Sequence, residues 1–232
     1  MGLAIALTVI FLWLAHLVYV LTSVPVDFAS PLLYLHVSLQ GYLYTGLFIT
    51  AHDAMHGSVS RSKTVNTVIG TVASILFAAL SYSKLRTNHS LHHCYPAQDR
   101  DPDYCQRSQN FFIWWGTFLF RYATILQIVI MAIVFNVLKL WIPEPSIWFF
   151  WVVPALLGSF QLFFIGTYLP HRLPHTEAMG FHRARTQRKN HFLAMLSCYF
   201  FGYHYEHHEW PTIPWWQLYR TKQQKPPGVA PQ

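Results

Sequence analysis

The stretch Phe201-Gly-Tyr-His204-Tyr-Glu-His207-His208 places three histidines within five positions, and its spacing recurs earlier in the chain. A second cluster, His89-Ser-Leu-His92-His93, has the same i, i+3, i+4 pattern, and a first cluster, His52-Asp-Ala-Met-His56, has an i, i+4 pair. On a helix these spacings put all members of a cluster on one face, so that several imidazoles can point to one place. We therefore expect a fold that brings the three clusters together.

The chain around these clusters has the composition of a membrane protein. Of its 232 residues, 53% are hydrophobic, 17% are aromatic and only 11% are charged, whereas about 25% of a soluble globular chain is charged. This composition argues against a soluble enzyme and against a disordered chain. The net charge of +7 fits the basic cytoplasmic loops of a membrane protein, so we expect no nucleic-acid partner. The cysteines Cys94, Cys105 and Cys198 have no CxxC spacing and are expected to be free thiols.

Apolar runs of about 20 residues, the length that crosses a bilayer, predict an all-α integral membrane protein with four transmembrane helices. The predicted spans are residues 2–21, 32–51, 122–141 and 147–169. The first run lacks the basic start and small-residue cleavage site of a signal peptide, which is the alternative. Residues 1–232 are interpreted as one domain, and the Pro-rich tail from about 223 to 232 is expected to be disordered.

Charge and the histidine clusters together predict the topology. The loop 22–30 and the turn 143–146 contain no Lys or Arg, while most of the 16 basic residues lie at the opposite ends of the spans. The positive-inside rule makes that opposite side cytoplasmic. The three clusters share one side only if the apolar segment Val65–Ser83 does not cross, so we predict an interfacial or re-entrant helix there. Both termini and the metal site are then cytoplasmic.

The number of clustered histidines predicts a site for two metal ions. Imidazole suits zinc, copper, iron and nickel. Eight or nine nitrogens are too many for one ion, because a tetrahedral zinc takes four ligands, whereas two irons with four or five nitrogens each match the count. His171, at the inner end of the last span, has the depth of a ninth ligand, although it is also consistent with an interfacial histidine. The predicted metal ligands are His52, His56, His89, His92, His93, His171, His204, His207 and His208.

The remaining histidines and four carboxylates have more local interpretations. Carboxylates commonly accept the free ring N–H of a metal-bound histidine and thereby orient it. Asp53 and Glu206 lie inside clusters, and Asp101 and Asp103 follow the second cluster, so all four are candidates for this role; a helix cap or an exposed charge is the alternative. Isolated histidines are expected to be hydrogen-bonded or exposed, namely His16, His36, His175, His182 and His191.

The three clusters resemble the histidine boxes of the membrane fatty-acid desaturase and hydroxylase superfamily. Flanking residues resemble more specifically the bacterial-type beta-carotene ketolases: the segment Phe48–Gly57, the Asp101-Pro-Asp103-Tyr sequence, and Phe201–His208 followed by Pro211, Pro214 and a Trp215-Trp216 pair. The resemblance runs from about Tyr42 to Tyr219. The chain departs from the family pattern at Tyr205 and at Tyr219-Arg220, positions that touch no predicted ligand but bear on substrate preference or reductant docking.

The resemblance implies a non-haem di-iron oxygenase that uses O2 and two electrons per turn. Its reaction would be hydroxylation of the allylic C4 of a beta-ionone ring, repeated at the same carbon to give a geminal diol that loses water to a ketone. Beta-carotene would become canthaxanthin through echinenone. Because the chain has no GxGxxG or P-loop motif, the electrons are expected from an external donor such as ferredoxin.

Other functions keep part of this chemistry. A fatty-acyl or carotenoid desaturase or hydroxylase would use the same di-iron site, and only the flanking residues favour the ketolase. A metal transporter is disfavoured because its polar ligands would lie near the bilayer midplane, and a zinc protease is disfavoured because no HExxH motif occurs.

Two surface features are open to two interpretations each. Five aromatic residues are equally consistent with a tunnel for a polyene and with an interfacial belt: Trp114, Trp115, Tyr203, Trp215 and Trp216. Four basic residues fit a docking site for an acidic electron carrier or anionic lipid, or ordinary cytoplasmic charge: Arg183, Arg185, Arg188 and Lys189.

Overall fold

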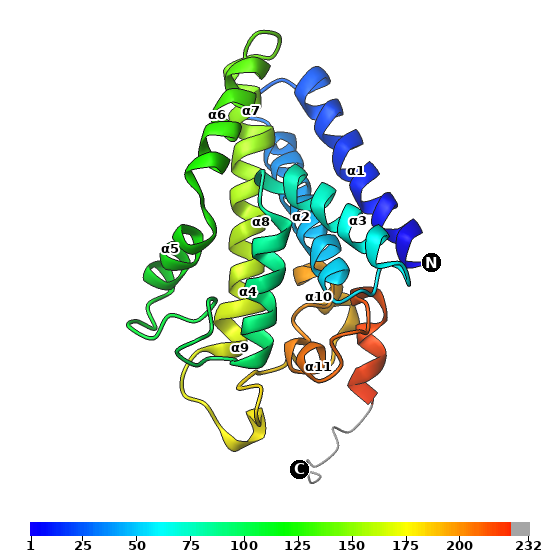
Figure 1. Ribbon diagram of the computed structural model, residues 1–232. Coiled ribbons are helices and arrows are strands. Elements are labelled where there is room, and N and C mark those ends of the chain that lie inside the picture. Colours follow the sequence, from blue (N-terminus) through cyan, green and yellow to red (C-terminus); the bar gives the residue numbers. More distant parts are fainter. Residues whose placement is uncertain (224–232) are drawn as a thin grey trace.

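The computed structural model describes residues 1–223, and every regular element in that part of the chain is helical. Long helical segments rise side by side toward one end of the molecule, while short helices and loops gather at the other end, where the chain's C-terminal part lies (Figure 1). The long segments are α1 (Gly2–Ser23), α2 (Pro31–Met55), α6 (Ile125–Leu138) and a continuous helix over Glu144–His171.

The first two helices are delimited by local signals. Extended backbone at Val24 ends α1, and Ser30 begins α2 by accepting a hydrogen bond from the Leu32 N–H, with Pro31 in the first turn, where its missing N–H costs nothing. The predicted span ends near residue 51, and α2 continues beyond it to Met55. The first histidine cluster therefore occupies the last turn of a long helix, and His56 caps it.

The long helix Glu144–His171 widens twice into π-turns. It comprises α7 (Glu144–Ile147), the π-helix η1 (Trp148–Val152), α8 (Val153–Phe163), the π-helix η2 (Phe164–Tyr168) and α9 (Leu169–His171). Pro154 and Pro170 stand in the first turns of α8 and α9. Because proline has no N–H and its ring crowds the preceding turn, the backbone widens just before each one. The predicted span 147–169 is thus part of a longer helix.

The predicted helix over 122–141 is wrong at its start. Tyr122 ends α5 (Phe111–Tyr122), and the chain bends by 88° before α6 begins at Ile125. The Thr124 hydroxyl accepts from the Gln127 N–H at 3.1 Å, while Gln127 Oε1 accepts from the Thr124 N–H at 3.3 Å. This reciprocal cap starts a new helix, a feature that an apolar run does not reveal.

The apolar segment after the first cluster forms α3 (Lys63–Ala78), which turns by 102° into α4 (Tyr82–Cys94). Ala79, with φ of 53°, ends α3, and Ser81 caps α4. The two helices approach closely at Gly70, where an added Cβ would lie 2.1 Å from the Tyr82 ring. The second histidine cluster lies on α4, which runs back alongside the end of α2.

The C-terminal part contributes short helices: η3 (Glu177–Met179), α10 (His191–Cys198), α11 (His204–Glu209) and η4 (Trp215–Gln223). The third cluster lies on α11. Gln223, expected in the disordered tail, is the last residue of η4, and residues 224–232 lie outside the described part of the chain. The Tyr42 hydroxyl donates to the Met195 carbonyl at 2.7 Å and so joins α10 to α2.

Within residues 1–223, two helices are long and apolar enough to cross a membrane by themselves, α1 and Glu144–His171. The number of candidate spans rises to four if the bent pairs α3–α4 and α5–α6 are each counted as one. A core that includes Trp13, Tyr44 and Phe77 packs between the helices and extends to Phe201, just before the third cluster. All three cysteines, which lie in this part of the chain, are free thiols as expected.

Candidate metal centre

The nine predicted ligands converge in two groups. The five-histidine group is His52, His56, His89, His93 and His207. The four-histidine group is His92, His171, His204 and His208. Within each group one ring nitrogen per residue lies within 4.8 Å of all the others, so the structure brings together all of the predicted histidines, His171 included.

The helical spacing divides each cluster between the groups. On α4, the i, i+4 pair His89 and His93 belongs to the five-histidine group, while His92 belongs to the four-histidine group. On α11 the pair His204 and His208 belongs to the four-histidine group, while His207 belongs to the other. An i, i+4 pair shares one helix face closely, and the intervening residue is rotated away from it. The two groups therefore lie next to each other.

The donor atoms fit metal ions. Neighbouring Nε2 atoms lie 2.7–3.1 Å apart in the five-histidine group and 2.9–3.1 Å apart in the four-histidine group. Lone pairs that converge at this distance repel one another unless a proton or a cation lies between them. Nitrogens about 2.1 Å from one ion and at right angles would lie about 3 Å apart. The contacts therefore match one ion in each group.

The three predicted ligands on α11 are held in their neutral form. His204, His207 and His208 are buried, and burial lowers the pKa of each well below the ordinary value, with the neighbouring histidines acting in the same direction. A neutral imidazole keeps the lone pair that a metal requires. These three rings are therefore in the protonation state that can bind a metal cation.

Asp101 lies where an orienting carboxylate is expected. His92 Nδ1 donates to it, 3.0 Å from each oxygen, and this leaves His92 Nε2 directed at the four-histidine group. The Ala97 and Asp103 N–H groups also donate to Asp101, each at 2.8 Å. Burial opposes ionisation of Asp101, but the charge of His92 and these hydrogen bonds outweigh it and lower the pKa of the carboxyl.

Within residues 1–223, the other three candidate carboxylates hydrogen-bond no predicted ligand. Asp103 accepts from the Tyr122 hydroxyl and lies 4.0 Å from His92 Nδ1; burial, aided by Asp101, raises its pKa to about 6. Asp53 lies 3.9 Å from His52 Nδ1 and instead accepts from the Trp215 N–H at 3.2 Å, which fastens η4 to the first cluster. Glu206 pairs with Lys222 at 2.8 Å.

Two of the four basic residues that fit either a docking site or ordinary cytoplasmic charge have internal contacts. Arg183 donates to the Ala97 carbonyl at 2.9 Å, and its own carbonyl accepts from His171 Nδ1 at 3.1 Å. Arg185 donates to the Arg172 carbonyl at 2.5 Å. These guanidinium groups hold the loop before α10 against the metal centre, whereas Arg188 and Lys189 remain exposed.

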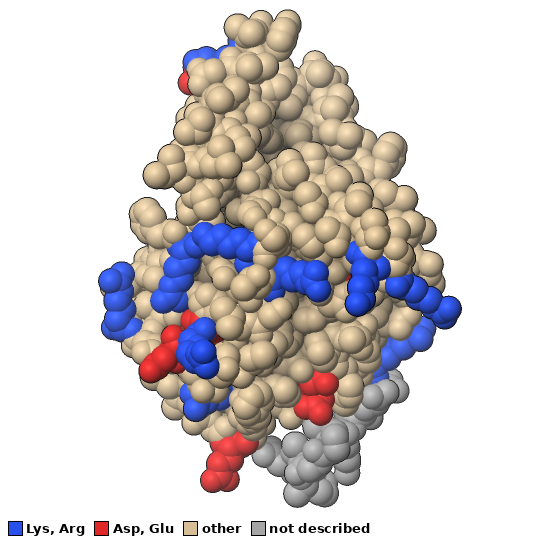
Figure 2. Space-filling model, viewed as in Figure 1, with Lys and Arg blue, Asp and Glu red and all other residues tan. Residues whose placement is uncertain are grey.

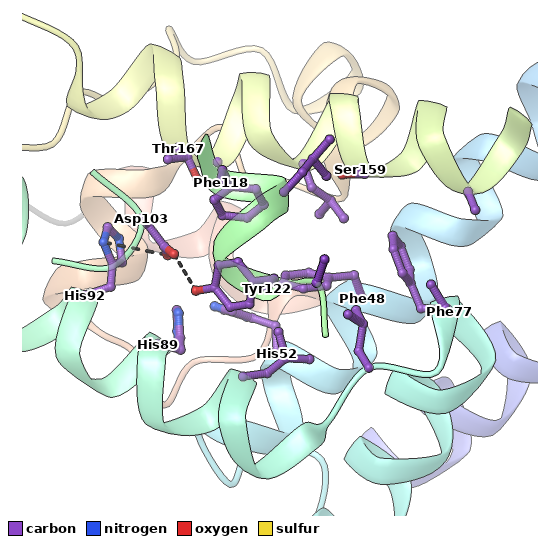
Figure 3. Close-up of a pocket in the computed structure, with 18 of the residues that line it drawn as sticks. Phe48, His52, Phe77, His89, His92, Asp103, Phe118, Tyr122, Ser159 and Thr167 are labelled. Atoms are coloured by element: carbon purple, nitrogen blue, oxygen red, sulfur yellow. Dashed lines mark hydrogen bonds and ion pairs between the residues drawn. The ribbon is translucent and has the colours of Figure 1, made fainter. Parts of the chain in front are cut away.

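An apolar cavity of about 230 Å³ ends at the histidines (Figure 3). His52, His89, His92 and His204, which come from both groups, line one end. Much of the wall is aromatic, formed by Phe48, Phe77, Phe118, Tyr122 and Phe201. The lining also includes Ala123 at the α5–α6 bend and Leu156 on α8, whose side chain is 49% exposed.

The aromatic residues considered for a tunnel do not line this cavity in the described chain. Trp114 is buried behind it and donates to the Asp103 carbonyl at 2.7 Å, and Trp215 packs edge-on against Tyr199. Sequence reasoning missed Tyr122, whose hydroxyl points to Asp103 across the cavity end (Figure 3). The signal for it was the capping sequence Thr124-x-x-Gln127, which implies that the chain turns just after Tyr122.

The sequence model of the family described as fatty acid desaturase matches residues 29–138 and 117–230. The chain belongs to the fatty acid desaturase family. This confirms the superfamily that the spacing of the three histidine clusters indicated.

The relatives that match most of the chain include carotenoid ketolases, whereas two desaturases match about a quarter of it. The chain is 37% identical to a zeaxanthin 4-ketolase of Chlamydomonas reinhardtii over 96% of its own length and 53% of the relative's. It is 34% identical to beta-carotene 4-ketolase 3 of Haematococcus lacustris over 82% of its own length and 62% of the relative's. It is 39% identical to a beta-carotene ketolase of Paracoccus sp. (strain PC1), over 78% and 75%. The chain therefore spans about half to two thirds of the algal relatives. No solved structure matches it.

Proposed function

We propose that the chain is an O2-dependent di-iron oxygenase that converts the C4 methylenes of beta-ionone rings to ketones, taking beta-carotene through echinenone to canthaxanthin. One observation carries this proposal: two adjacent histidine groups form the end of an apolar cavity. The similarity to ketolases from an alga and a bacterium directs the choice of substrate, because a metal site of this kind would also serve an acyl desaturase or hydroxylase.

The two groups would each hold one iron, with five nitrogens in one group and four in the other. When bound, the irons would supply the oxidation of a non-acidic allylic C–H bond by O2, a reaction beyond the reach of acid–base side chains. The protein's own contribution is to orient the ligands, to exclude water and to hold the ring with C4 toward the histidines.

The cavity supports a substrate that enters with one end. Pockets that enclose a whole drug-sized ligand measure roughly 300–1,000 Å³, so about 230 Å³ holds a ring and leaves the rest of a long polyene outside. Three hydroxyl-bearing residues are in the lining, namely Tyr122, Ser159 and Thr167. They offer hydrogen-bond partners to the C4 alcohol, which must stay in place or return for the second hydroxylation before the geminal diol loses water.

A membrane position with four crossings fits the distribution of charge. Figure 2 shows Lys and Arg as a belt across the middle of the molecule, with a surface that carries few charged residues on the long-helix side. A charged pair occurs far from the belt, Lys139 with Glu144 at 2.7 Å. We place the cytoplasmic membrane boundary at the belt and let α1, α2, the bent pair α5–α6 and Glu144–His171 cross. The 102° turn between α3 and α4 then returns the chain to the same side as an interfacial or re-entrant segment, and both termini are cytoplasmic in a single membrane domain.

Electrons would come from an external donor of the ferredoxin type, since no dinucleotide-binding fingerprint occurs in the sequence. Of the four basic residues considered for docking, only Arg188 and Lys189 are exposed. They are the part of that cluster available to an acidic carrier.

The test is expression of the chain in a bacterium that accumulates beta-carotene, followed by chromatography of the pigments with mass detection. We expect products that gain one oxygen and lose two hydrogens per ring, and no product from His207→Ala. His191→Leu is the matched control, because His191 bonds to the Tyr203 hydroxyl at 3.0 Å and belongs to neither group. Oxygen gained without hydrogen loss would indicate a hydroxylase, and unchanged pigment with altered acyl chains would indicate an acyl desaturase.

A further inference from the structure

His182, expected to be an isolated histidine, lies beside the four-histidine group. Its Nε2 is 3.0 Å from a Glu209 carboxylate oxygen. Because a carboxylate only accepts, Nε2 carries the ring proton, and Nδ1 of the neutral ring holds a lone pair. That Nδ1 atom is buried and has no hydrogen-bond partner among residues 1–223. A buried acceptor without a donor destabilises the folded protein. We therefore expect a hydrogen-bond donor in the surroundings of this nitrogen.

His208 presents the complementary atom. Its Nε2 points into the four-histidine group, 3.1 Å from His92 Nε2 and 3.0 Å from His204 Nε2. If Nε2 binds a metal, Nδ1 must carry the proton. In the described chain this Nδ1 is also buried without a partner. Two other members of the group do have one: His92 donates to Asp101, and His171 contacts the Arg183 carbonyl. The fourth, His204, has an Nδ1 that is likewise buried without a partner in this part of the chain.

The two rings are neighbours. The centroids of His182 and His208 lie 5.5 Å apart with the planes tilted by 40°, and in this structure the two Nδ1 atoms are not hydrogen-bonded to each other. The Tyr205 ring packs edge-on against His182 with the ring centroids 5.5 Å apart, so His182 packs against two residues of α11, Tyr205 and His208. Resting on the proposed di-iron centre, we propose that Glu209 and His182 form a positioning pair for His208: Glu209 fixes the tautomer of His182, and His182 Nδ1 accepts the His208 Nδ1–H when the group holds its iron.

The arrangement gives His208 what Asp101 gives His92. A ligating imidazole whose second N–H is bonded keeps its tautomer and its orientation, and the loss of such a partner typically lowers metal affinity or activity by about 10–100-fold. His182 comes from the loop before α10, which Arg183 holds through the Ala97 carbonyl. The same loop therefore serves two ligands of one group, His171 by a carbonyl and His208 by a side chain.

The test measures iron rather than product. The purified full chain and its variants are loaded with iron-57, and both the iron content per chain and the rate of iron loss to a ferrous chelator are measured. We expect His182→Leu to release one of the two irons about tenfold faster or more, with a change in one of the two Mössbauer signals. His182→Gln should restore retention, because its amide accepts from His208 and donates to Glu209. His191→Leu is the control and should match the wild type.

Glu209→Ala provides a second route if His182→Leu does not fold, since the Glu209 side chain is 24% exposed and its loss frees the tautomer of His182. Accelerated loss of one iron from this variant supports the pair. Wild-type rates in both His182→Leu and Glu209→Ala would overturn it. A wild-type chain that binds no iron would refute the proposed centre itself, whereas one that binds iron without ketolating carotene leaves the positioning pair standing.

Discussion

The two histidine groups differ in what surrounds them. The four-histidine group is tied to Asp101 and to the Arg183 carbonyl through ring nitrogens that face away from the centre. In the described chain the five-histidine group has no such carboxylate contact closer than Asp53, 3.9 Å from His52. Orientation of His92 and His171 in the smaller group therefore depends on outer hydrogen bonds, and orientation of the larger group depends more on the helices that carry it. Substitutions in and around the two groups can test this difference.

The largest expected effect is removal of one ligand from each group. His207→Ala, in the five-histidine group, and His204→Ala, in the four-histidine group, should both reduce ketolation to background, because the reaction needs both irons. Each should retain the iron of the other group, which metal analysis of the purified chain measures. Loss of both irons from either variant would show that the groups are one interdependent site.

The next effect separates the outer contacts of the two groups. Asp101→Asn should lower iron affinity by about 10–100-fold, because a neutral amide no longer fixes His92 through a charge-assisted hydrogen bond. The matched control is Glu206→Gln, whose carboxylate pairs with Lys222 and not with a histidine. Chelator competition measures both variants. Equal affinities in Asp101→Asn and the wild type would contradict the account.

A change in the cavity should affect substrate and leave the metal unaffected. Ala155→Trp places a large ring in the cavity wall and should lower ketolation by about tenfold or more by excluding the ring, in keeping with the shape dependence of such pockets. Iron content should equal that of the wild type. Pigment analysis and metal analysis of the same preparation test this, and unchanged ketolation would move the substrate to another surface.

The smallest expected effect concerns the bend between α3 and α4, which positions the second histidine cluster. Gly70→Ala should destabilise the chain by about 1–3 kcal/mol, because its Cβ would meet the Tyr82 ring where α3 turns into α4. Gly116→Ala is the matched control, since a Cβ there meets nothing within 4 Å, and it should be neutral or slightly stabilising. Thermal unfolding in the same detergent compares the two variants. Equal unfolding midpoints would contradict the prediction.

Sequence reasoning reached the nine histidines because their spacing on helices is a local property, and every one of them joins a group. It could not divide them into five and four, since His92 and His207 join the group opposite their neighbours only once α4, α11 and α9 are placed in space. His171 was identifiable by its depth at the end of an apolar run, because the helix continues to it without interruption.

The partners of the carboxylates and the positions of the helix bends were harder to predict from the sequence. Asp53 and Glu206 stand next to ligands in sequence, yet adjacent helical positions point in different directions, and the structure gives them Trp215 and Lys222 as partners. The bend after Tyr122 was hidden within an apolar run, where a Thr–Gln cap leaves hydropathy unchanged. The cavity depends on this bend, so its lining could not be anticipated from the sequence.

The most direct measurement of the central claim is an isotope experiment in whole cells. Bacteria that accumulate beta-carotene and express the chain are grown under ¹⁸O2, and their carotenoids are analysed by mass spectrometry, with His207→Ala as the negative control. We predict that every new keto oxygen carries the label, since both oxygens of the geminal diol come from O2. An unlabelled keto oxygen, or unchanged beta-carotene in cells whose membranes contain the iron-loaded protein, would contradict the account.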